Sequence, residues 1–409
     1  MKSEWDDGDF EIHFLDVGQG DGTFIICPEG ECILVDLGSK KNGDIAGSDA
    51  VTFLVDTLND IQIKRGLSNP TIDLMVLTHG DGDHYNLIPQ LLNSFDDDPL
   101  DVYLLAIGGP KSDYGDANSE IREFINTQDA NDALVDLGDN VRDAANHPRY
   151  TYSTDLVQVY ILSANYPQKN GGSKNAKSVV LMIVYQGRKI ILTGDAEAPT
   201  EGEILLHYNA AFLQCDALKL GHHGSKNGTS ANWLAALQPK MAFASSDMKW
   251  AHPYCEVIKR VSDTGNLWQA MFHWWLCGAG AGVTKNYYNH FSKCGVYSAL
   301  AFQIQLNQED MEDDEMEVND MLIDQADEDP VNDPLPDGLV QGAHYTLFIY
   351  PKGPFQAKGD VEVAYAAGNM AGSSGRANAW PQAICDDAAA TPAFRSFSDR
   401  PMRELVVFQ

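Results

Sequence analysis

The chain has 409 residues, of which 44% are hydrophobic, and it carries a formal net charge of −31 at pH 7. This length and apolar content predict one large domain with additions and a substantial buried core. The strong negative charge argues against binding of nucleic acid or an anionic membrane by the surface as a whole. A polyanion would need a local basic patch or bound metal ions.

The cysteine content and the N-terminal segment bear on the cellular compartment. The seven cysteines are odd in number and form no Cys-x-x-Cys pair, which favours reduced thiols over a disulfide framework. The first ten residues lack an apolar signal region, and no run of about eighteen apolar residues occurs. We therefore expect a cytoplasmic protein without a membrane segment.

Short apolar strands alternate with helical patterns along most of the chain. Strands are expected at 11–17, 23–27, 32–35, 71–77, 101–107, 156–162, 178–185, 189–193, 216–220 and 241–245. Helices are expected at 49–61, 85–95, 118–125 and 254–261. The first three strands, joined by tight turns, predict an antiparallel meander.

A polar turn lies between the expected strand 71–77 and the helix after it. His79, Asp81, Asp83 and His84 place four potential metal ligands within six residues, and two glycines allow a tight bend. Alternating imidazole and carboxylate groups can face two neighbouring metal ions. The alternative is a polar loop that only caps the helix, with Asp83 as the N-cap.

Further polar residues follow other expected strands. Asp195 follows one strand, the pair His222 and His223 follows another, and His252 comes after a third. Because strand ends converge in α/β folds, these side chains are expected to share one site. Asp36, also at a strand end, could either form a turn or orient a metal-bound histidine.

The composition divides the chain into four parts. We expect a catalytic domain over 1–265, an aromatic-rich extension packing on it over 266–308, an acidic linker or loop over 309–343, and a C-terminal segment of unknown role over 344–409. Residues 309–337 hold fourteen Asp or Glu and no Lys or Arg, which predicts a flexible segment. This run could act as a solubilising loop, or it could compete with a polyanionic substrate.

Seven motifs occur along the first two thirds of the chain. They are LDVGQGD (15–21), LVDLG (34–38), LTHGDGDH (77–84), NAKSVVL (175–181), ILTGD (191–195), LKLGHHGS (218–225) and AHP (251–253). This ordered set resembles the ComEC-like metallo-β-lactamase-fold hydrolases. The resemblance implies an α/β fold, an αββα sandwich with a C-terminal extension, and a dinuclear metal site at one edge. ComEC proteins carry this domain beside a membrane channel, whereas here we expect it to stand alone.

The resemblance also implies the metal ligands. His79 and Asp81 would hold one ion, Asp83 and His84 the other, Asp195 would bridge them, and His222 would be the last histidine ligand. Asn175 stands where related hydrolases have a further histidine. Oxygen ligands favour Mn²⁺ somewhat over Zn²⁺, so the expected cofactor is two divalent ions, Zn²⁺ or Mn²⁺.

Catalytic roles are expected for Asp83, in the ligand turn, and for His223, His252 and Lys219, which could neutralise phosphate oxygens or protonate a leaving group. Ser225 is a further candidate, and His223 could instead only pack behind His222. The expected function is a metal-dependent hydrolase, a phosphodiesterase or nuclease acting on DNA, RNA or a nucleotide. The alternatives are hydrolysis of another ester, amide or thioester, and a non-catalytic interaction protein.

Overall fold

The computed structural model describes most of the chain up to Thr264 and several strands beyond it. Between 5 and 264 it omits 6–9, 16, 18, 41–44, 96–97, 136, 138–148, 155, 167–172, 186, 240, 246–251 and 263. Beyond 264 it describes 269–271, 296–297, 343–349, 361–367, 395–397 and 404–408. The expected acidic linker over 309–343 lies outside the described residues apart from its last one, and the aromatic-rich extension lies outside them except at two short strands.

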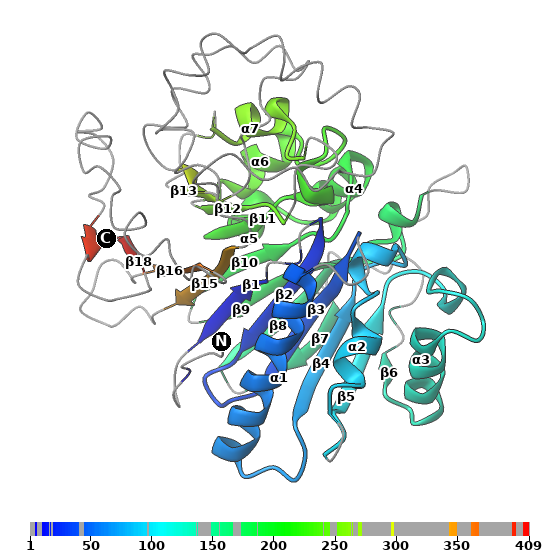
Figure 1. Ribbon diagram of the computed structural model, residues 1–409. Helices are drawn as coiled ribbons and strands as arrows, with labels where there is room; N and C mark the ends of the chain where they lie inside the picture. Colours follow the sequence, from blue (N-terminus) through cyan, green and yellow to red (C-terminus); the bar gives the residue numbers. More distant parts are fainter. Residues whose placement is uncertain are drawn as a thin grey trace, which may run out of the picture.

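Two mixed β-sheets form the centre of the protein (Figure 1). The first contains β1 (Glu11–Phe14), β2 (Gly20–Ile26), β3 (Cys32–Ser39), β4 (Thr71–Leu77), β5 (Asp101–Ile107), β6 (Leu134–Val135), β15 (Ala343–Ile349), β16 (Val361–Ala367), β17 (Arg395–Phe397) and β18 (Glu404–Phe408). Its strand order is β17-β18-β16-β15-β1-β2-β3-β4-β5-β6. The expected meander is confirmed, since β1 to β3 pair antiparallel in sequence order.

The second sheet is built from the middle of the chain. It contains β7 (Arg149–Ser153), β8 (Val157–Ser163), β9 (Val180–Tyr185), β10 (Arg188–Leu192), β11 (Ala217–Lys219), β12 (Met241–Phe243), β13 (Gln269–Met271) and β14 (Val296–Tyr297). Its order is β14-β13-β12-β11-β10-β9-β8-β7. Strands β10, β11 and β12 run parallel, so their carboxyl ends meet at one edge.

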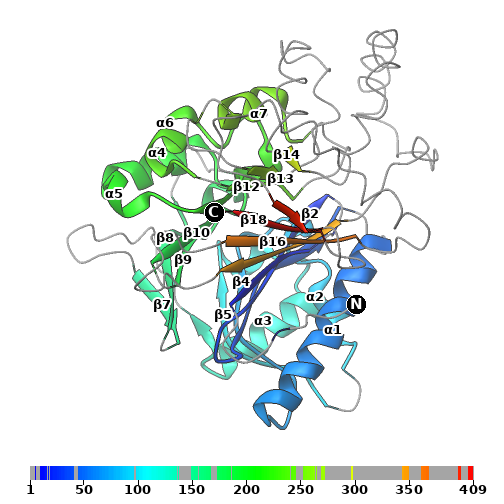
Figure 2. The ribbon, with the colours of Figure 1, turned by 90° about the vertical axis from the view of Figure 1, so that its left-hand side faces the viewer.

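Helices cover the outer face of each sheet, as the view turned by 90° shows (Figure 2). The first sheet carries α1 (Ile45–Arg65), α2 (Ile88–Leu92) and α3 (Glu120–Ala130). The second carries α4 (Ala198–His207), α5 (Ala210–Leu213), α6 (Ala231–Leu237) and α7 (Cys255–Ser262). The order of layers is helix, sheet, sheet, helix, which is the expected αββα sandwich.

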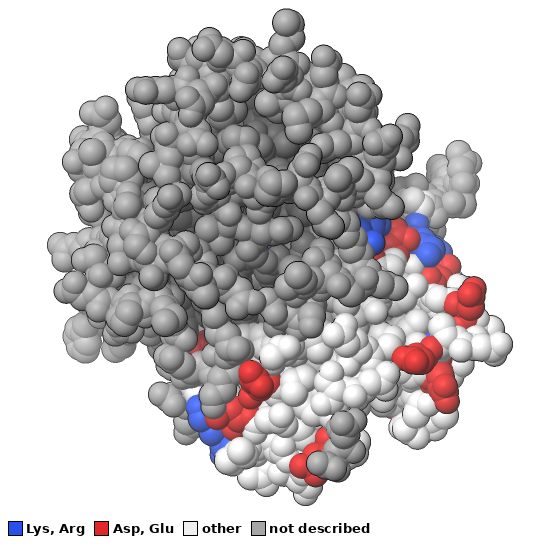
Figure 3. All heavy atoms as spheres, viewed as in Figure 1, with Lys and Arg blue, Asp and Glu red and all other residues white. Residues whose placement is uncertain are grey.

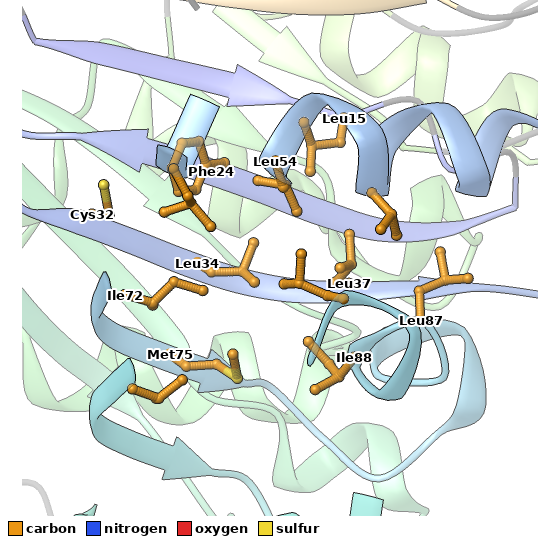
Figure 4. Close-up of a cluster of buried hydrophobic side chains, with 14 of the residues drawn as sticks. Leu15, Phe24, Cys32, Leu34, Leu37, Leu54, Ile72, Met75, Leu87 and Ile88 are labelled. Atoms are coloured by element: carbon orange, nitrogen blue, oxygen red, sulfur yellow. The ribbon is translucent and has the colours of Figure 1, made fainter. Parts of the chain in front are cut away.

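Three buried apolar layers hold these elements together. The central layer lies between the sheets and includes Phe14, from β1, stacked on Phe243, from β12, with ring centroids 4.1 Å apart. A second layer joins the first sheet to its helices, where Phe24 and Leu34 face Leu54 of α1 (Figure 4). A third joins the second sheet to its helices and includes Trp233 of α6. Strand β9, with the sequence VLMIVY, lies between two of these layers and reads as a continuous apolar run.

The helix expected at 85–95 is shorter in the structure. Residues Gly82–His84 wind into a 3₁₀ turn, η1, and α2 begins only at Ile88. Pro89 occupies the first turn of α2, where its missing N–H costs nothing because first-turn N–H groups have no partner within the helix. The ligand turn is therefore a compact turn of its own and not the start of a long helix.

The chain beyond 343 adds strands to the first sheet. Strand β15 pairs antiparallel with β1, with Glu11 opposite Phe348, and β16 pairs with β15 in turn. Strand β1 is therefore paired on both sides, which removes an open sheet edge. No helix among the described residues is both long enough and apolar enough to cross a membrane.

Candidate metal centre

The ligand turn after β4 is held by close backbone contacts. A Cβ at Gly38, in β3, would lie 2.4 Å from the carbonyl carbon of Asp83, and one at Gly80 would lie 2.5 Å from Cβ of Asp113. Both positions therefore require glycine, because a side chain would push the turn away. The turn lies against β3 on one side and the segment around Asp113 on the other.

Four histidines and three aspartates converge at this edge of the sheets, around the carboxylate of Asp195. The turn after β4 supplies His79, Asp81, Asp83 and His84, the turn after β10 supplies Asp195, and η4 (Gly221–Gly224) supplies His222 and His223. Sequence analysis predicted that these turns converge, and the structure brings all seven side chains together.

One group surrounds Oδ2 of Asp195, and we call it half-site A. It comprises His79, Asp81, His222 and this oxygen. Nε2 of His79 lies 3.7 Å from Oδ2 of Asp195 and 3.5 Å from Oδ2 of Asp81. Nε2 of His222 lies 3.6 Å from the same oxygen of Asp195.

A second group surrounds Oδ1 of Asp195, and we call it half-site B. It comprises Asp83, His84, His223 and this oxygen. Nε2 of His84 lies 3.2 Å and Nε2 of His223 lies 3.5 Å from Oδ1 of Asp195. Nε2 of His223 also lies 3.4 Å from Oδ2 of Asp83. His223 thus lies with Asp83 and His84, and His222 lies with the other group.

These separations suit ligands of shared metal ions. Two ligand atoms bound at about 2.1 Å with tetrahedral angles lie about 3.4 Å apart. The separations from 3.2 to 3.7 Å bracket that value. Asp83, His84 and His223 of half-site B bring one donor atom each within 4.8 Å of the others, and so do His79, His84 and Asp195, which span the two half-sites. The histidine and aspartate clusters can therefore hold divalent metal.

In three of the histidines, hydrogen bonds to Nδ1, on the side of the ring away from Asp195, determine which ring nitrogen carries the proton. Nδ1 of His84 lies 2.8 Å from Oδ2 of Asp36. Nδ1 of His223 lies 2.7 Å from the carbonyl oxygen of Ser245, and Nδ1 of His222 lies 3.2 Å from Oε1 of Glu197. Carboxylate and carbonyl oxygens only accept hydrogen bonds, so each Nδ1 donates. In each neutral ring, Nε2 then carries a lone pair that faces Asp195.

His79 follows the same pattern through Thr78. The Thr78 hydroxyl donates to Oδ2 of Asp36 at 2.6 Å, so it can accept from Nδ1 of His79 at 3.2 Å. Among the described residues, Nε2 of His79, His84 and His223 and Oδ1 of Asp195 are buried without a hydrogen-bond partner. Such orphaned donors and acceptors are costly, and bound divalent ions would satisfy all of them.

Charge coupling in the pocket shows how strongly it favours positive charge. Burial by itself would lower the pKa of His84, but the carboxylates of Asp195 and Asp36 raise it well above its ordinary value. Burial would raise the pKa of Asp195, yet the surrounding His223, His84 and His79 hold it well below its usual range. A divalent ion bound here would supply the positive charge that these carboxylates favour.

Three lysines pair with the aspartates of this region. Nζ of Lys40 lies 2.7 Å from Oδ1 of Asp83, and Nζ of Lys174 lies 3.4 Å from Oδ1 of Asp81. Lys219 forms a buried ion pair with Asp21, behind half-site B. Lys219, predicted as a donor to phosphate, is thus buried and directed at Asp21.

The other candidates lie close to the two histidines of η4. The His252 ring centroid is 5.6 Å from that of His222 and 6.4 Å from that of His223. Burial, together with the neighbouring His223 and His222, lowers the pKa of His252 to about 3, so its ring is neutral at pH 7. Ser225 is buried, and its backbone N–H donates to the carbonyl oxygen of His222.

The backbone at η4 explains how adjacent histidines reach different half-sites. His222 (φ 49°, ψ 53°) and His223 (φ 52°, ψ 20°) both lie in the left-handed region. For residues with a side chain this conformation costs of order 1 kcal/mol or more each, and it persists where surrounding contacts enforce it. Two successive left-handed residues direct the two rings to either side of Asp195.

Sequence analysis did not identify three residues that orient the rings, namely Thr78, Glu197 and Ser245. Ser245 acts through its backbone carbonyl, so its residue type carries no signal. Glu197 lies two residues after Asp195, on the turn before α4, and a single glutamate on a turn does not stand out. Asp36 is the exception, because its place at a strand end indicated an orienting role, and its contact with His84 fits that expectation.

Comparison with known proteins agrees with the fold. The model of the metallo-beta-lactamase superfamily matches residues 15–139. ComE operon protein 3 of Bacillus subtilis is 27% identical over 264 residues, which cover 61% of this chain and 30% of that protein. Recombination protein 2 of Haemophilus influenzae is 26% identical over 255 residues, which cover 62% of this chain and 26% of that protein. The chain thus spans about a third or less of these relatives' length.

A solved structure shares the fold name. The metallo-beta-lactamase fold protein YhfI from Bacillus subtilis is 12% identical, with a TM-score of 0.34, and the match covers 62% of this chain and 93% of that one. The family model and these relatives, together with the αββα layers, show a metallo-β-lactamase fold and support a ComEC-like protein.

Proposed function

We propose that this protein is a metal-dependent phosphodiesterase that acts on nucleic acid or nucleotides through a dinuclear centre. The observation that carries the proposal is the convergence of histidine Nε2 atoms on the two oxygens of Asp195, three of them buried without a hydrogen-bond partner. Two groups of ligands that share one carboxylate suit two ions about 3.5–4 Å apart. We propose His79, Asp81, Asp195 and His222 as ligands of one ion, and Asp83, His84, Asp195 and His223 as ligands of the other.

The bound ions, Zn²⁺ or Mn²⁺, would activate water and stabilise charge on the attacked phosphorus centre. The chain's own contribution is to hold the ligands in place before substrate arrives. Asp195 spans both half-sites, and Asp36 fixes the His84 ring through Nδ1. In the proposed reaction, the oxygen of water bonds to phosphorus, the bond from phosphorus to the leaving oxygen breaks, and the proton that the water loses is balanced by the one that the leaving oxygen gains.

The lysines beside the aspartates favour a phosphate substrate over a neutral ester or amide. The Lys40 and Lys174 side chains are about two-fifths exposed and lie against Asp83 and Asp81. Once divalent ions neutralise those carboxylates, the ammonium groups can pair with non-bridging phosphate oxygens. On the face seen in Figure 3, basic side chains likewise lie beside acidic ones.

His252 and Lys219 contribute in different ways. The neutral His252 ring, beside His222 and His223, can exchange hydrogen bonds with a phosphate oxygen or with water. Lys219 balances the buried charge of Asp21 and so supports half-site B from behind. One relative, that of Haemophilus influenzae, is named for recombination, and this name agrees with a nucleic acid substrate. The Bacillus subtilis relative is named for the ComE operon.

The test compares substrates on one metal-loaded preparation. Bis(p-nitrophenyl) phosphate should be hydrolysed with Zn²⁺ or Mn²⁺, and p-nitrophenyl acetate and a thioester should be hydrolysed far more slowly. The Asp195→Ala variant, purified alongside, controls for contaminating enzymes. Faster hydrolysis of the carboxylic ester or thioester would replace the proposal with the alternative hydrolase. Absence of turnover on all substrates, with metal bound, would favour an interaction protein.

A further inference from the structure

The two half-sites differ sharply in exposure to solvent. In half-site B, the side chains of Asp83, His84 and His223 are at most 3% exposed. In half-site A, Asp81 is 38% and His222 is 25% exposed. A metal ion in half-site A would therefore be open to solvent on the side of Asp81 and His222, whereas half-site B encloses its ion.

His222 is the ligand of half-site A that depends most on outside support. Its backbone is left-handed, and its ring, which is partly exposed to solvent, reaches Asp195 through Nε2. Nδ1 lies 3.2 Å from Oε1 of Glu197, the last residue before α4. Glu197 occupies the N-cap position of that helix but makes no capping hydrogen bond with its side chain. Its carboxylate is instead directed at the His222 ring.

Asn175 completes this contact. Its Nδ2 lies 3.5 Å from Oε1 of Glu197 and 3.2 Å from Nδ1 of His222. Because Nδ1 of His222 donates to the carboxylate, the Asn175 amide can donate to Glu197 or, at 3.5 Å, to Nε2 of His222, and if flipped it can accept from Nδ1. Either orientation keeps the proton on Nδ1, so Nε2 keeps the lone pair that would bind a metal ion beside Asp195.

We infer that Glu197 is a positioning residue for His222, and that through His222 it controls metal occupancy of half-site A while leaving half-site B unaffected. The inference rests on the proposed dinuclear centre but not on the identity of the substrate. A carboxylate that orients a metal-binding histidine typically contributes a factor of about 10–100 in metal affinity. Loss of Glu197 should therefore convert a centre with two ions into one that keeps only the enclosed ion at limiting metal.

The test is a Zn²⁺ titration of the full-length, metal-stripped protein by calorimetry with a competing chelator. The wild type should show two binding steps. Glu197→Ala should weaken the weaker step by about 10–100-fold and leave the tighter step unchanged. Glu197→Gln keeps an oxygen that accepts from Nδ1, so it should restore most of the lost affinity.

Glu203, within α4, provides a matched control. Oε1 of Glu203 lies 2.9 Å from Nε2 of His207, within α4 and outside the centre. Glu203→Ala removes a comparable pair and should bind both ions as the wild type does. A double-mutant cycle completes the design: in a His222→Ala background, Glu197→Ala should have no further effect on either step.

Several results would overturn the inference. These are wild-type binding by Glu197→Ala, equal weakening of both steps, failure of Glu197→Gln to restore affinity, or additive losses in the double variant. Metal binding is measured without substrate, so this outcome is separate from the proposed function. If the titrations follow expectation but no phosphodiester is hydrolysed, the positioning role stands and the proposed activity fails. A wild type that binds no Zn²⁺ would overturn both.

Discussion

The carboxylate of Asp36 lies 2.8 Å from Nδ1 of His84, on the opposite side of the ring from Asp195. Both oxygens of Asp36 are used, because Oδ1 also accepts the backbone N–H of Thr78 at 2.7 Å. One carboxylate in β3 therefore fixes both the start of the ligand turn and the ring at its end. Asp36 adopts φ 58°, a left-handed conformation that aspartate and asparagine tolerate better than most residues.

The first prediction concerns this carboxylate. Asp36→Asn should keep the backbone conformation but lose one acceptor, so metal affinity should fall by about 10–100-fold. Asp36→Ala should also lose the contacts with Thr78 and unfold more easily, by about 1–3 kcal/mol. Metal titration and urea denaturation separate the two effects. Unchanged affinity in Asp36→Asn would show that the ring is held by other contacts.

The second prediction concerns the shared carboxylate. Asp195→Ala should abolish activity, by at least about a thousandfold, because its loss disrupts both half-sites at once. The fold should remain, since Asp195 lies on a turn outside the apolar layers. Turnover at saturating metal and far-UV circular dichroism give the two measurements. Near wild-type turnover would show that Asp195 does not bridge the ions.

The third prediction concerns metal content. The reconstituted protein should bind close to two divalent ions, because two groups of ligands share Asp195. Each ion should stabilise the folded state, by about 2.7 kcal/mol when free metal is a hundredfold above its dissociation constant. Metal analysis and thermal unfolding with and without chelator provide the measurements. A chelator that removes no metal and leaves the unfolding temperature unchanged would contradict the dinuclear centre.

The fourth prediction concerns the cysteines of the first sheet. Cys27 and Cys32 are fully buried, and burial raises the pKa of each thiol well above its ordinary value. Raised pKa values keep the reactive thiolate scarce, so both residues should resist iodoacetamide up to about pH 9 in the folded protein. Urea should release both. Labelling sites are read by mass spectrometry, and rapid native labelling of either residue would show that β2 and β3 open locally.

The fifth prediction concerns the apolar layer between the sheets. Phe243 stacks on Phe14 with an angle of 12° between the rings, and both are buried. Phe243→Ala should destabilise the protein by about 3–5 kcal/mol, through lost burial and a cavity. Phe243→Leu, which leaves less empty volume, should cost much less. Denaturant unfolding measures both, and equal, small losses would show that the layer repacks around the gap.

The sequence by itself determined most of the strands that form the core and the turns that converge on the candidate metal centre. Strand 71–77 and the ligand turn after it were predictable, because apolar runs of strand length and clustered ligand residues are local signals. The helix at 254–261 was also found within one residue at each end. By contrast, α4 to α6 were not predicted, since they span only ten, four and seven residues, too few for a helical period to stand out, and they are stabilised by packing on the second sheet.

Only the tertiary structure decided which histidine belongs to which half-site. His222 and His223 are neighbours in sequence, and no pattern distinguishes them. Their left-handed backbone separates the rings, and the groups that accept from Nδ1, Glu197 for one and the carbonyl of Ser245 for the other, come from different turns. These contacts join residues that are distant in sequence, and they form only when the strand ends come together. The local sequence therefore cannot predict them.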